Sequence, residues 1–427
     1  MVLLPIIKSD VSGPCVKIPF NHRIVFIFVE MLRTKPAAAH PYFNFQFGLL
    51  CTSNFLFSAS FNMMIPELPD YLTRLGGAEY KGLIIALFTL MAGISRPFSG
   101  KLTDTVGRVP VMIFGSLVCV VCSLLYPVLH TVFGFLLLRF FHGFSTGFKP
   151  TATSAYGADV VHESRRGEAL GALAIGYTTG SSIGPIVGSY VVNHFSFNAM
   201  FVVSACFALG SVMILYNIKE TLPNPQKFKP EVLRISRYEI FDPSAIRPAL
   251  IMVLMSFALG TVLTVSPDLS SSVGLYNKGI FFTFYTVTSL AIRLLAGKSS
   301  DRYGRNIVLL LSSLVLFVSM VLLAFVHTAP MILLGSAIFG LSLGMNGPTL
   351  MAWTVDLCNV LNRGKAVASV YIALEVGIGA GALISAWIYH NRAENFVYTF
   401  LFPAFMAFIA FVLLLRWRMY PKKTVTA

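Results

Sequence analysis

Long apolar stretches alternate with short polar segments along almost the whole chain. A helix needs about 20 mainly apolar residues to cross a hydrocarbon core of about 30 Å. The stretches of this length lie at 46–68, 81–99, 110–129, 132–155, 168–192, 197–217, 247–267, 278–296, 307–327, 330–353, 365–389 and 396–415. They are apolar on all sides and interrupted by glycine, whereas barrel strands alternate in polarity. The pattern therefore predicts twelve transmembrane helices, six in each half of the chain.

The composition supports a membrane protein. The 427 residues are 56% hydrophobic and only 12% charged, and the mean hydropathy is +0.75. Too few polar residues are present to cover a soluble globule of this size. The net charge of +14 would suggest nucleic-acid binding in a soluble protein, but here its distribution has another meaning, and no nucleic-acid partner is predicted.

Most basic residues lie in alternate loops. The loops after the second, fourth, sixth, eighth and tenth stretches and the C-terminal tail carry many Lys and Arg, whereas the alternate loops hold only Arg74, Lys81, Lys278 and Arg392. Positive charge marks the cytoplasmic side. We therefore expect both termini in the cytoplasm and a multi-pass protein embedded in the lipid bilayer of a bacterial inner or plasma membrane.

One segment occurs twice. GKLTDTVGR at 100–108 returns as GKSSDRYGR at 297–305, a shift of 197 positions that also places Arg96 on Arg293 and Asp159 on Asp356. Such a repeat predicts two parallel halves related by an axis along the membrane normal, with a binding site at their interface. The predicted divisions are a leader that is disordered or started too early (1–44), two six-helix halves (45–217 and 247–417), a cytoplasmic linker (218–246) and a cytoplasmic tail (418–427).

The repeated segment carries a recognisable motif: Gly, three residues, Asp, two residues, Gly, Arg. The residues that satisfy it are Gly100, Asp104, Gly107 and Arg108 in the first half, and Gly297, Asp301, Gly304 and Arg305 in the second. On these residues the chain resembles the major facilitator superfamily, over about 46 to 417. The resemblance implies an all-α membrane protein of twelve helices in two pseudo-symmetric halves, and it implies that these loops latch the halves on the cytoplasmic side. Solvated turns would explain one such motif, but not two at matched spacing.

The fifth stretch contains GSSIGPIVGS at 180–189. It resembles the antiporter motif of the drug:proton antiporter type through Gly180, Gly184, Pro185 and Gly188, while Ser189 departs from the pattern. Glycine at every fourth position lets another helix pack closely, and a proline removes one backbone hydrogen bond. This motif favours export over import.

Arg139, His142 and Glu375 lie inside predicted helices and are the candidates for proton coupling. Arg139 lies about 12 Å from the outer end of its helix and Glu375 about 15 Å deep, near the midplane. Ionisable groups at such depth are candidates for function. Arg139 could take part in proton coupling or anchor neighbouring helices through backbone carbonyls. His142 has a hydrogen-bonding or a titrating role. Glu375 could exchange a proton near neutrality if unpaired, or form a structural ion pair.

Further polar residues are candidates for the substrate cavity, although each could equally form a hydrogen bond between packed helices. They are Asn54, Asn62, Tyr177, Thr178, Tyr285, Asn346 and Tyr371. Asp70 and Asp268, each following a proline, are expected to begin solvated loops. The absence of an aspartate inside the first helix disfavours a polyspecific role with cationic drugs.

The sequence lacks nucleotide-binding, zinc-binding and catalytic motifs, so no enzyme activity, cofactor or metal is predicted, and energy must come from an ion gradient. We predict a secondary active transporter that works as a monomer and couples protons to efflux of small, drug-like molecules by alternating access. One alternative is a proton symporter or uniporter importing a sugar, an organic acid or another metabolite. The other is a non-transporting membrane sensor or assembly protein.

Overall fold

The computed structural model describes residues 45–160, 166–233, 241–358 and 363–419, all within a compact unit that begins at Tyr42. The predicted leader and most of the predicted tail lie outside these residues. The described residues form helices and short turns, with no strand. The predicted all-α architecture is therefore confirmed.

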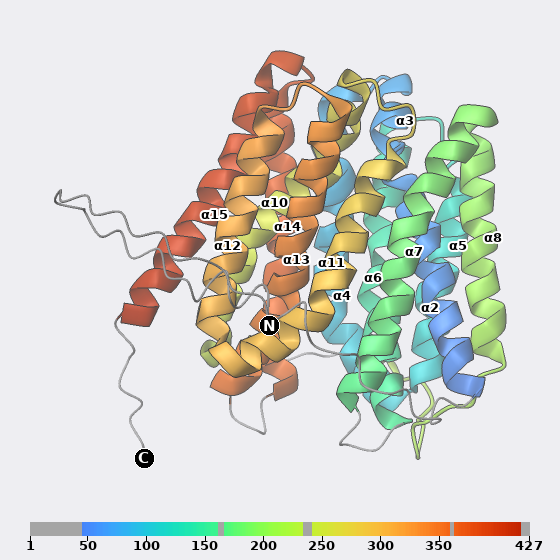
Figure 1. Cartoon of the computed structure of the whole chain (residues 1–427). Coiled ribbons are helices and arrows are strands. Elements are labelled where there is room, and N and C mark those ends of the chain that lie inside the picture. Colours follow the sequence, from blue (N-terminus) through green and yellow to red (C-terminus); the bar gives the residue numbers. More distant parts are fainter. Residues whose placement is uncertain (1–44, 161–165, 234–240, 359–362, 420–427) are drawn as a thin grey trace, which may run out of the picture. The chain divides into compact units, whose positions relative to one another are not determined.

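The long helices coincide with the predicted apolar stretches. In the first half they are α2 (Phe45–Met64), α4 (Lys81–Thr105), α5 (Arg108–Leu125), α6 (Val132–Asp159), α7 (Arg166–His194) and α8 (Phe197–Tyr216), with a short α3 (Leu68–Arg74). In the second half they are α10 (Ile246–Ser272), α11 (Gly279–Tyr303), α12 (Arg305–Ala324), α13 (Ala329–Leu357), α14 (Arg363–Tyr389) and α15 (Phe396–Met419). Figure 1 shows the two halves side by side, with α12 and α15 at one edge and α5 and α8 at the other.

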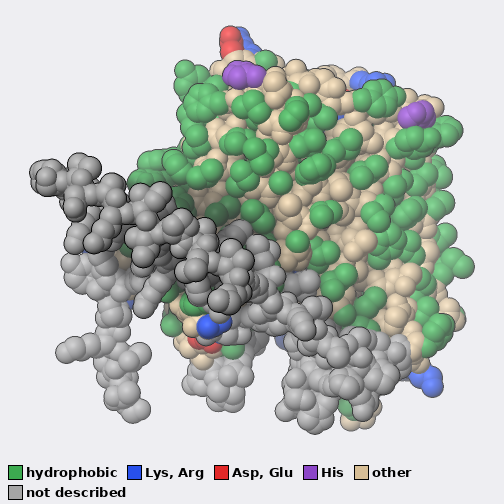
Figure 2. Space-filling model, viewed as in Figure 1, with side chains coloured by type: hydrophobic (Ala, Val, Ile, Leu, Met, Phe, Trp, Pro, Cys, Tyr) green, Lys and Arg blue, Asp and Glu red, His purple; other side chains and the backbone are tan. Residues whose placement is uncertain are grey.

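Most of these helices suit a bilayer. Within the described residues, 8 helices are long and apolar enough to cross a membrane, or 9 if α2 and α3, which meet at an angle of 41°, count as one bent span. Figure 2 shows hydrophobic side chains across the middle of the visible face, with charged and histidine side chains near its upper and lower margins. This distribution is what a hydrocarbon environment requires.

Glycines bring equivalent helices into close contact in both halves. A Cβ atom on Gly180, Gly184 or Gly188 of α7 would lie 2.3, 2.6 or 1.9 Å from a backbone oxygen of α2. A Cβ on Gly377 or Gly381 of α14 would lie 2.6 or 2.3 Å from a backbone oxygen of α10. The glycine stripe therefore permits the α2–α7 and α10–α14 contacts, which the repeat relates to each other.

The two halves meet through two further equivalent contacts, α4 with α14 and α7 with α11. At the first, a Cβ on Gly82 would lie 2.7 Å from Cβ of Ala386. At the second, a Cβ on Gly279 would lie 2.2 Å from the backbone oxygen of Pro185. We call the end of the bundle that carries α3 the α3 side (upper in Figure 1) and the opposite end the Arg108 side. Both glycine contacts lie toward the α3 side.

Candidate functional site

An ion pair joins the two halves where α4 meets α14. Nη2 of Arg96 lies 2.6 Å from Oε1 of Glu375, and the two side chains are only 15% and 10% exposed. The Arg96 guanidinium also lies over the ring of Tyr371, 4.8 Å from its centroid. One turn earlier in α4, Gly93 packs against the glutamate, since a Cβ there would lie at van der Waals contact distance, 3.4 Å, from Cβ of Glu375. The arrangement holds a nearly buried carboxylate of one half against a cation of the other.

This pairing changes the interpretation of Glu375. The sequence leaves open both an unpaired carboxyl that exchanges a proton and a structural ion pair, and the structure gives Glu375 a close cationic partner. Removing one member of a buried ion pair costs about 3–5 kcal/mol, because the other charge is left uncompensated. Any role of Glu375 in proton coupling must therefore act through making and breaking its bond to Arg96. From the sequence, Arg96 stands out only as a repeat position, although its place inside an apolar stretch is a usable signal.

The repeat partner of Arg96 has no equivalent carboxylate. Arg293 lies in α11, and the position that corresponds to Glu375 is Thr178 of α7. Among the described residues, the buried Nε of Arg293 has no hydrogen-bond acceptor. Arg293 lies close enough to Tyr177 and Tyr371 for electrostatic interaction with both. The site is therefore pseudo-symmetric in its arginines but asymmetric in its charge.

The predicted cavity residues fall into two groups. Tyr177 and Tyr371 lie near the two arginines, and Tyr285 lies near Tyr177. Thr178 is buried in α7.

The asparagines lie elsewhere. Nδ2 of Asn54 donates to the carbonyl oxygen of Leu173 at 2.9 Å, and Nδ2 of Asn62 donates to that of Ser58 at 2.8 Å. Asn346 is buried in α13, and its Oδ1 has no donor among the described residues. Tyr371 therefore lies against the ion pair and Tyr177 near it, Tyr285 packs against Phe339, and Asn54 and Asn62 bond to backbone.

Arg139 and His142 hold the first half together. Nε of Arg139 donates to the carbonyl oxygen of Ile84 at 3.0 Å, and its guanidinium lies 4.5 Å from the ring centroid of Phe88. His142 is fully buried, with Nδ1 3.2 Å from the Tyr126 hydroxyl. These contacts bind α6 to α4 and to the end of α5. The geometry therefore supports the anchoring interpretation of Arg139, and a part in proton coupling stays a prediction.

A second buried cation in α6 was missed by sequence analysis. Lys149 is fully buried. Its Nζ donates to the backbone oxygen of Ser53 at 2.9 Å and to the hydroxyl of Ser211, and it lies 4.6 Å from the ring centroid of Phe57. These contacts join α6 to α2 and α8. The signal was available, because a lysine inside an apolar stretch is as exceptional as an arginine.

Two reciprocal ion pairs cross between the halves on the α3 side. Nζ of Lys81 lies 2.6 Å from Oδ2 of Asp268, with side chains 11% and 12% exposed. Lys278 pairs with Asp70, with side chains 12% and 42% exposed. The expectation that Asp70 and Asp268 begin solvated loops is wrong, because both lie in helices, α3 and α10, and each faces a lysine of the opposite half. We call these two contacts the α3-side ion pairs.

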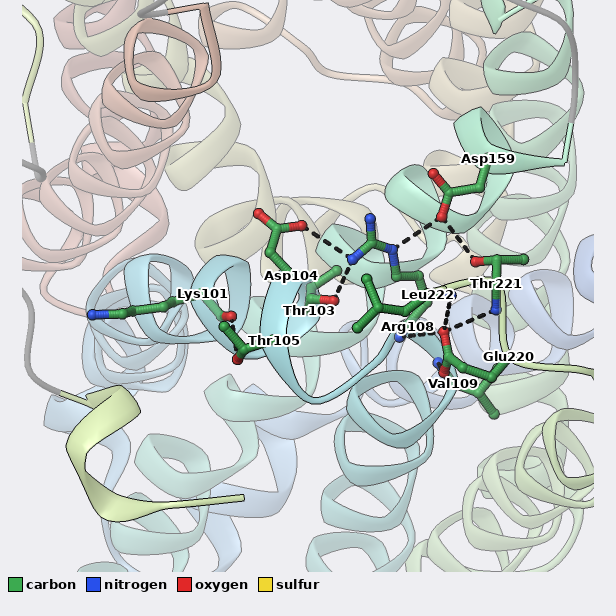
Figure 3. Close-up of polar contacts among 10 residues, drawn as sticks. All are labelled: Lys101, Thr103, Asp104, Thr105, Arg108, Val109, Asp159, Glu220, Thr221 and Leu222. Carbon is green, nitrogen blue, oxygen red and sulfur yellow. Dashed lines mark hydrogen bonds and ion pairs between the residues drawn. The ribbon is translucent and has the colours of Figure 1, made fainter. Parts of the chain in front are cut away.

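The predicted latch loop of the first half forms a polar network on the Arg108 side (Figure 3). Nε of Arg108 donates to Oδ2 of Asp159 at 3.0 Å, and Nη1 contacts Oδ1 of Asp104 at 3.2 Å. Glu220 of the linker accepts from the backbone N–H of Arg108 at 3.0 Å and that of Val109 at 2.9 Å. The glutamate therefore satisfies two free donors at the start of α5.

Glycine geometry explains part of the latch motif. Gly107 has φ +139°, and a Cβ there would lie 2.6 Å from Oε2 of Glu220. Gly304 has φ +92° at the equivalent turn. A Cβ on Gly100 would meet nothing within 4 Å. The first two positions thus require glycine for backbone conformation, and Gly100 has space for a side chain in this conformation.

The second latch loop repeats the arginine contact. Nε of Arg305 donates to Oδ2 of Asp356 at 2.9 Å, as Arg108 does to Asp159. The surroundings of Gly297 and of the Asp301 side chain lie outside the described part of the structure. Arg108 binds residues of its own half and linker, and Arg305 binds Asp356 of its own half. The latch between halves remains a prediction.

Comparisons with known proteins agree with this architecture. The family model for the Major Facilitator Superfamily matches residues 50–276 and 248–427. The multidrug resistance protein MdtG of Salmonella arizonae is 26% identical over 288 residues, 64% of this chain and 71% of that protein. The multi-drug resistance efflux pump PmrA of Streptococcus pneumoniae is 24% identical over 370 residues, 84% of this chain and 92% of that protein. A crystal structure of a D-xylose-proton symporter has a TM-score of 0.72 at 17% identity, covering 87% of this chain and 97% of that one.

Proposed function

The chain belongs to the major facilitator superfamily, and we propose that it exports small amphipathic molecules in exchange for protons. As a member of this family it is an integral membrane transporter of small molecules and not an enzyme. Its fold is the major facilitator fold. The proposal places the α3 side outward and both termini in the cytoplasm, in agreement with the distribution of basic residues. It also assigns transport to a single copy of the chain.

The Glu375–Arg96 ion pair is the observation that carries the proposal. It bridges the halves at 2.6 Å between side chains that are mostly buried. The pair spans the contact between α4 and α14, so we infer that it breaks in the conformational change that separates these two helices. Protonation of Glu375 removes the charge that holds Arg96. A proton therefore shifts the balance between two conformations, which is the requirement for coupling proton movement to transport.

The preference for export rests on two observations. The α7 sequence contains the Gly-x-x-x-Gly-Pro pattern through Gly180, Gly184 and Pro185, and Pro185 contacts α11 of the other half. In addition, the names of two relatives describe multidrug resistance and multidrug efflux. Because the fold is shared with a sugar-proton symporter, the test must also determine direction.

The proposal is tested in inside-out membrane vesicles with an imposed proton gradient, acid inside. The panel consists of ethidium, norfloxacin, 1-naphthoate, benzoate and D-xylose. We expect the parent protein to accumulate at least one compound against its gradient and Glu375→Gln to accumulate none. The matched control is Glu394→Gln, because Glu394 is 72% exposed and its contact with Arg392 is 3.6 Å. Gradient-driven accumulation by Glu375→Gln equal to the parent's, or uptake driven only in the opposite direction, would contradict the proposal.

A further inference from the structure

We propose that Arg293 binds the anionic group of the transported molecule, so that the substrate class is amphipathic organic anions carrying a carboxylate or a group of similar shape. This inference rests on the proposed function and specifies its substrate. It comes from the difference between two arginines that the repeat makes equivalent.

The repeat shows what Arg293 lacks. Arg96 in α4 contacts Glu375 of α14, and Arg293 lies in α11, the helix that makes the equivalent contact with α7 of the other half. The first arginine is neutralised by Glu375 at 2.6 Å. At the position equivalent to Glu375, α7 has Thr178, which cannot neutralise a cation. One half therefore supplies a carboxylate for the arginine of the other, whereas the equivalent position supplies only a neutral hydroxyl.

The charge of Arg293 also favours an anionic ligand. The Arg96–Glu375 pair has no net charge, so beside it Arg293 adds a positive charge that no carboxylate among the described residues neutralises. None of the ion pairs among the described residues includes Arg293, whereas Arg96 is paired. The buried Nε of Arg293, like that of Arg96, has no acceptor among the described residues. A buried cation without a partner costs several kcal/mol. A bound anion would offset that cost, whereas a cationic ligand would raise it.

The surroundings specify the rest of the ligand. Tyr177 and Tyr371 lie within electrostatic reach of Arg293, and the Tyr177 ring lies 6.2 Å from that of Phe61. Tyr371 is 37% exposed although it lies against Arg96 of the other half. A planar guanidinium binds a carboxylate through two parallel hydrogen bonds, and the aromatic rings suit an apolar or aromatic body. The chemistry thus fits a compact aromatic carboxylate.

The test is equilibrium dialysis of radiolabelled 1-naphthoate against the purified full-length protein in detergent, with 1-naphthamide as the neutral probe of the same shape. We expect Arg293→Gln to weaken 1-naphthoate binding at least tenfold, and Arg293→Lys to stay within about threefold of the parent. Neither change should alter the weaker binding of 1-naphthamide. The readout needs no proton gradient, so it is independent of whether Glu375 couples transport to protons.

A second pair of variants keeps the test decisive if Arg293→Gln does not fold. Thr178→Glu supplies the missing carboxylate and should pair with Arg293 as Glu375 pairs with Arg96. It should therefore weaken 1-naphthoate binding at least tenfold, while Thr178→Gln binds as the parent does. Undiminished binding in Arg293→Gln or Thr178→Glu would overturn the assignment. So would failure of the parent protein to bind any of 1-naphthoate, benzoate and octanoate.

Discussion

The α3-side ion pairs allow a quantitative prediction, because the repeat offers the same substitution at two differently exposed positions. Asp268→Asn removes the carboxylate that faces Lys81, and Asp70→Asn removes the one that faces Lys278. The first pair is 11% and 12% exposed. In the second pair the lysine is 12% exposed but the aspartate is 42% exposed. Both pairs cross between the halves and must break when the α3 side opens.

The burial determines the expected magnitudes. Breaking a fully buried ion pair costs about 3–5 kcal/mol, and an exposed pair contributes at most about 1 kcal/mol. Since the Lys81–Asp268 pair retains some exposure, we expect Asp268→Asn to favour the α3-open conformation by about 2 kcal/mol, a shift of about 30-fold. Asp70→Asn should give about 1 kcal/mol or less, a shift of about fivefold at most. The change is chemically identical, so the ranking depends on burial alone.

The assay measures distances between spin labels placed at Glu79 and Glu394, one on each half, by double electron–electron resonance in a cysteine-free background. A longer-distance population should grow in Asp268→Asn and less so in Asp70→Asn. Circular dichroism and thermal unfolding serve as controls for folding. Unchanged distances in Asp268→Asn, or a larger shift in Asp70→Asn, would refute the reasoning.

Three further predictions follow from packing and from the Arg108 network. Gly188→Ala should lower the yield of folded protein because its Cβ would lie 1.9 Å from a backbone oxygen of α2, whereas Gly100→Ala should be tolerated because nothing lies within 4 Å; size-exclusion chromatography distinguishes the two. Arg139→Gln should lower the thermal unfolding midpoint by several degrees, because the bond from Arg139 to α4 is lost. If the variant protein that does fold couples protons normally, Arg139 acts as an anchor and not in coupling. Asp159→Asn should slow transport more than Asp104→Asn, since Asp104 is 72% exposed and Asp159 only 31%; equal rates would show that burial does not determine the contribution.

The sequence predicted the helices well because a bilayer imposes a simple requirement on each of them. Every long helix needs enough apolar residues to cross, and this property is local. The repeat likewise showed which helices are equivalent, including the glycine-lined contacts of α7 and α14. The bend after Met64 was missed, although Pro66 and Pro69 lie there.

The contacts between halves could not be predicted, because they join residues far apart in the chain. Arg96 and Glu375 are 279 residues apart in the chain. No local pattern specifies which faces of their helices meet. The same reason explains the error over Asp268, whose position at the end of an apolar stretch suggested solvent. For Arg139, depth in the membrane was predictable, but its acceptor on α4 was not. The sequence identifies Arg293 as the repeat partner of Arg96. That Arg96 has a carboxylate partner and Arg293 has none among the described residues depends on contacts between distant helices.

The most direct test of proton coupling separates exchange from accumulation in one vesicle preparation. Counterflow of a transported compound without a proton gradient requires only binding and alternating access, whereas accumulation requires coupling. For Glu375→Gln we predict counterflow close to the parent rate and no accumulation when a proton gradient is imposed. Accumulation at the parent level by Glu375→Gln would contradict the account and would place the coupling group elsewhere in the molecule.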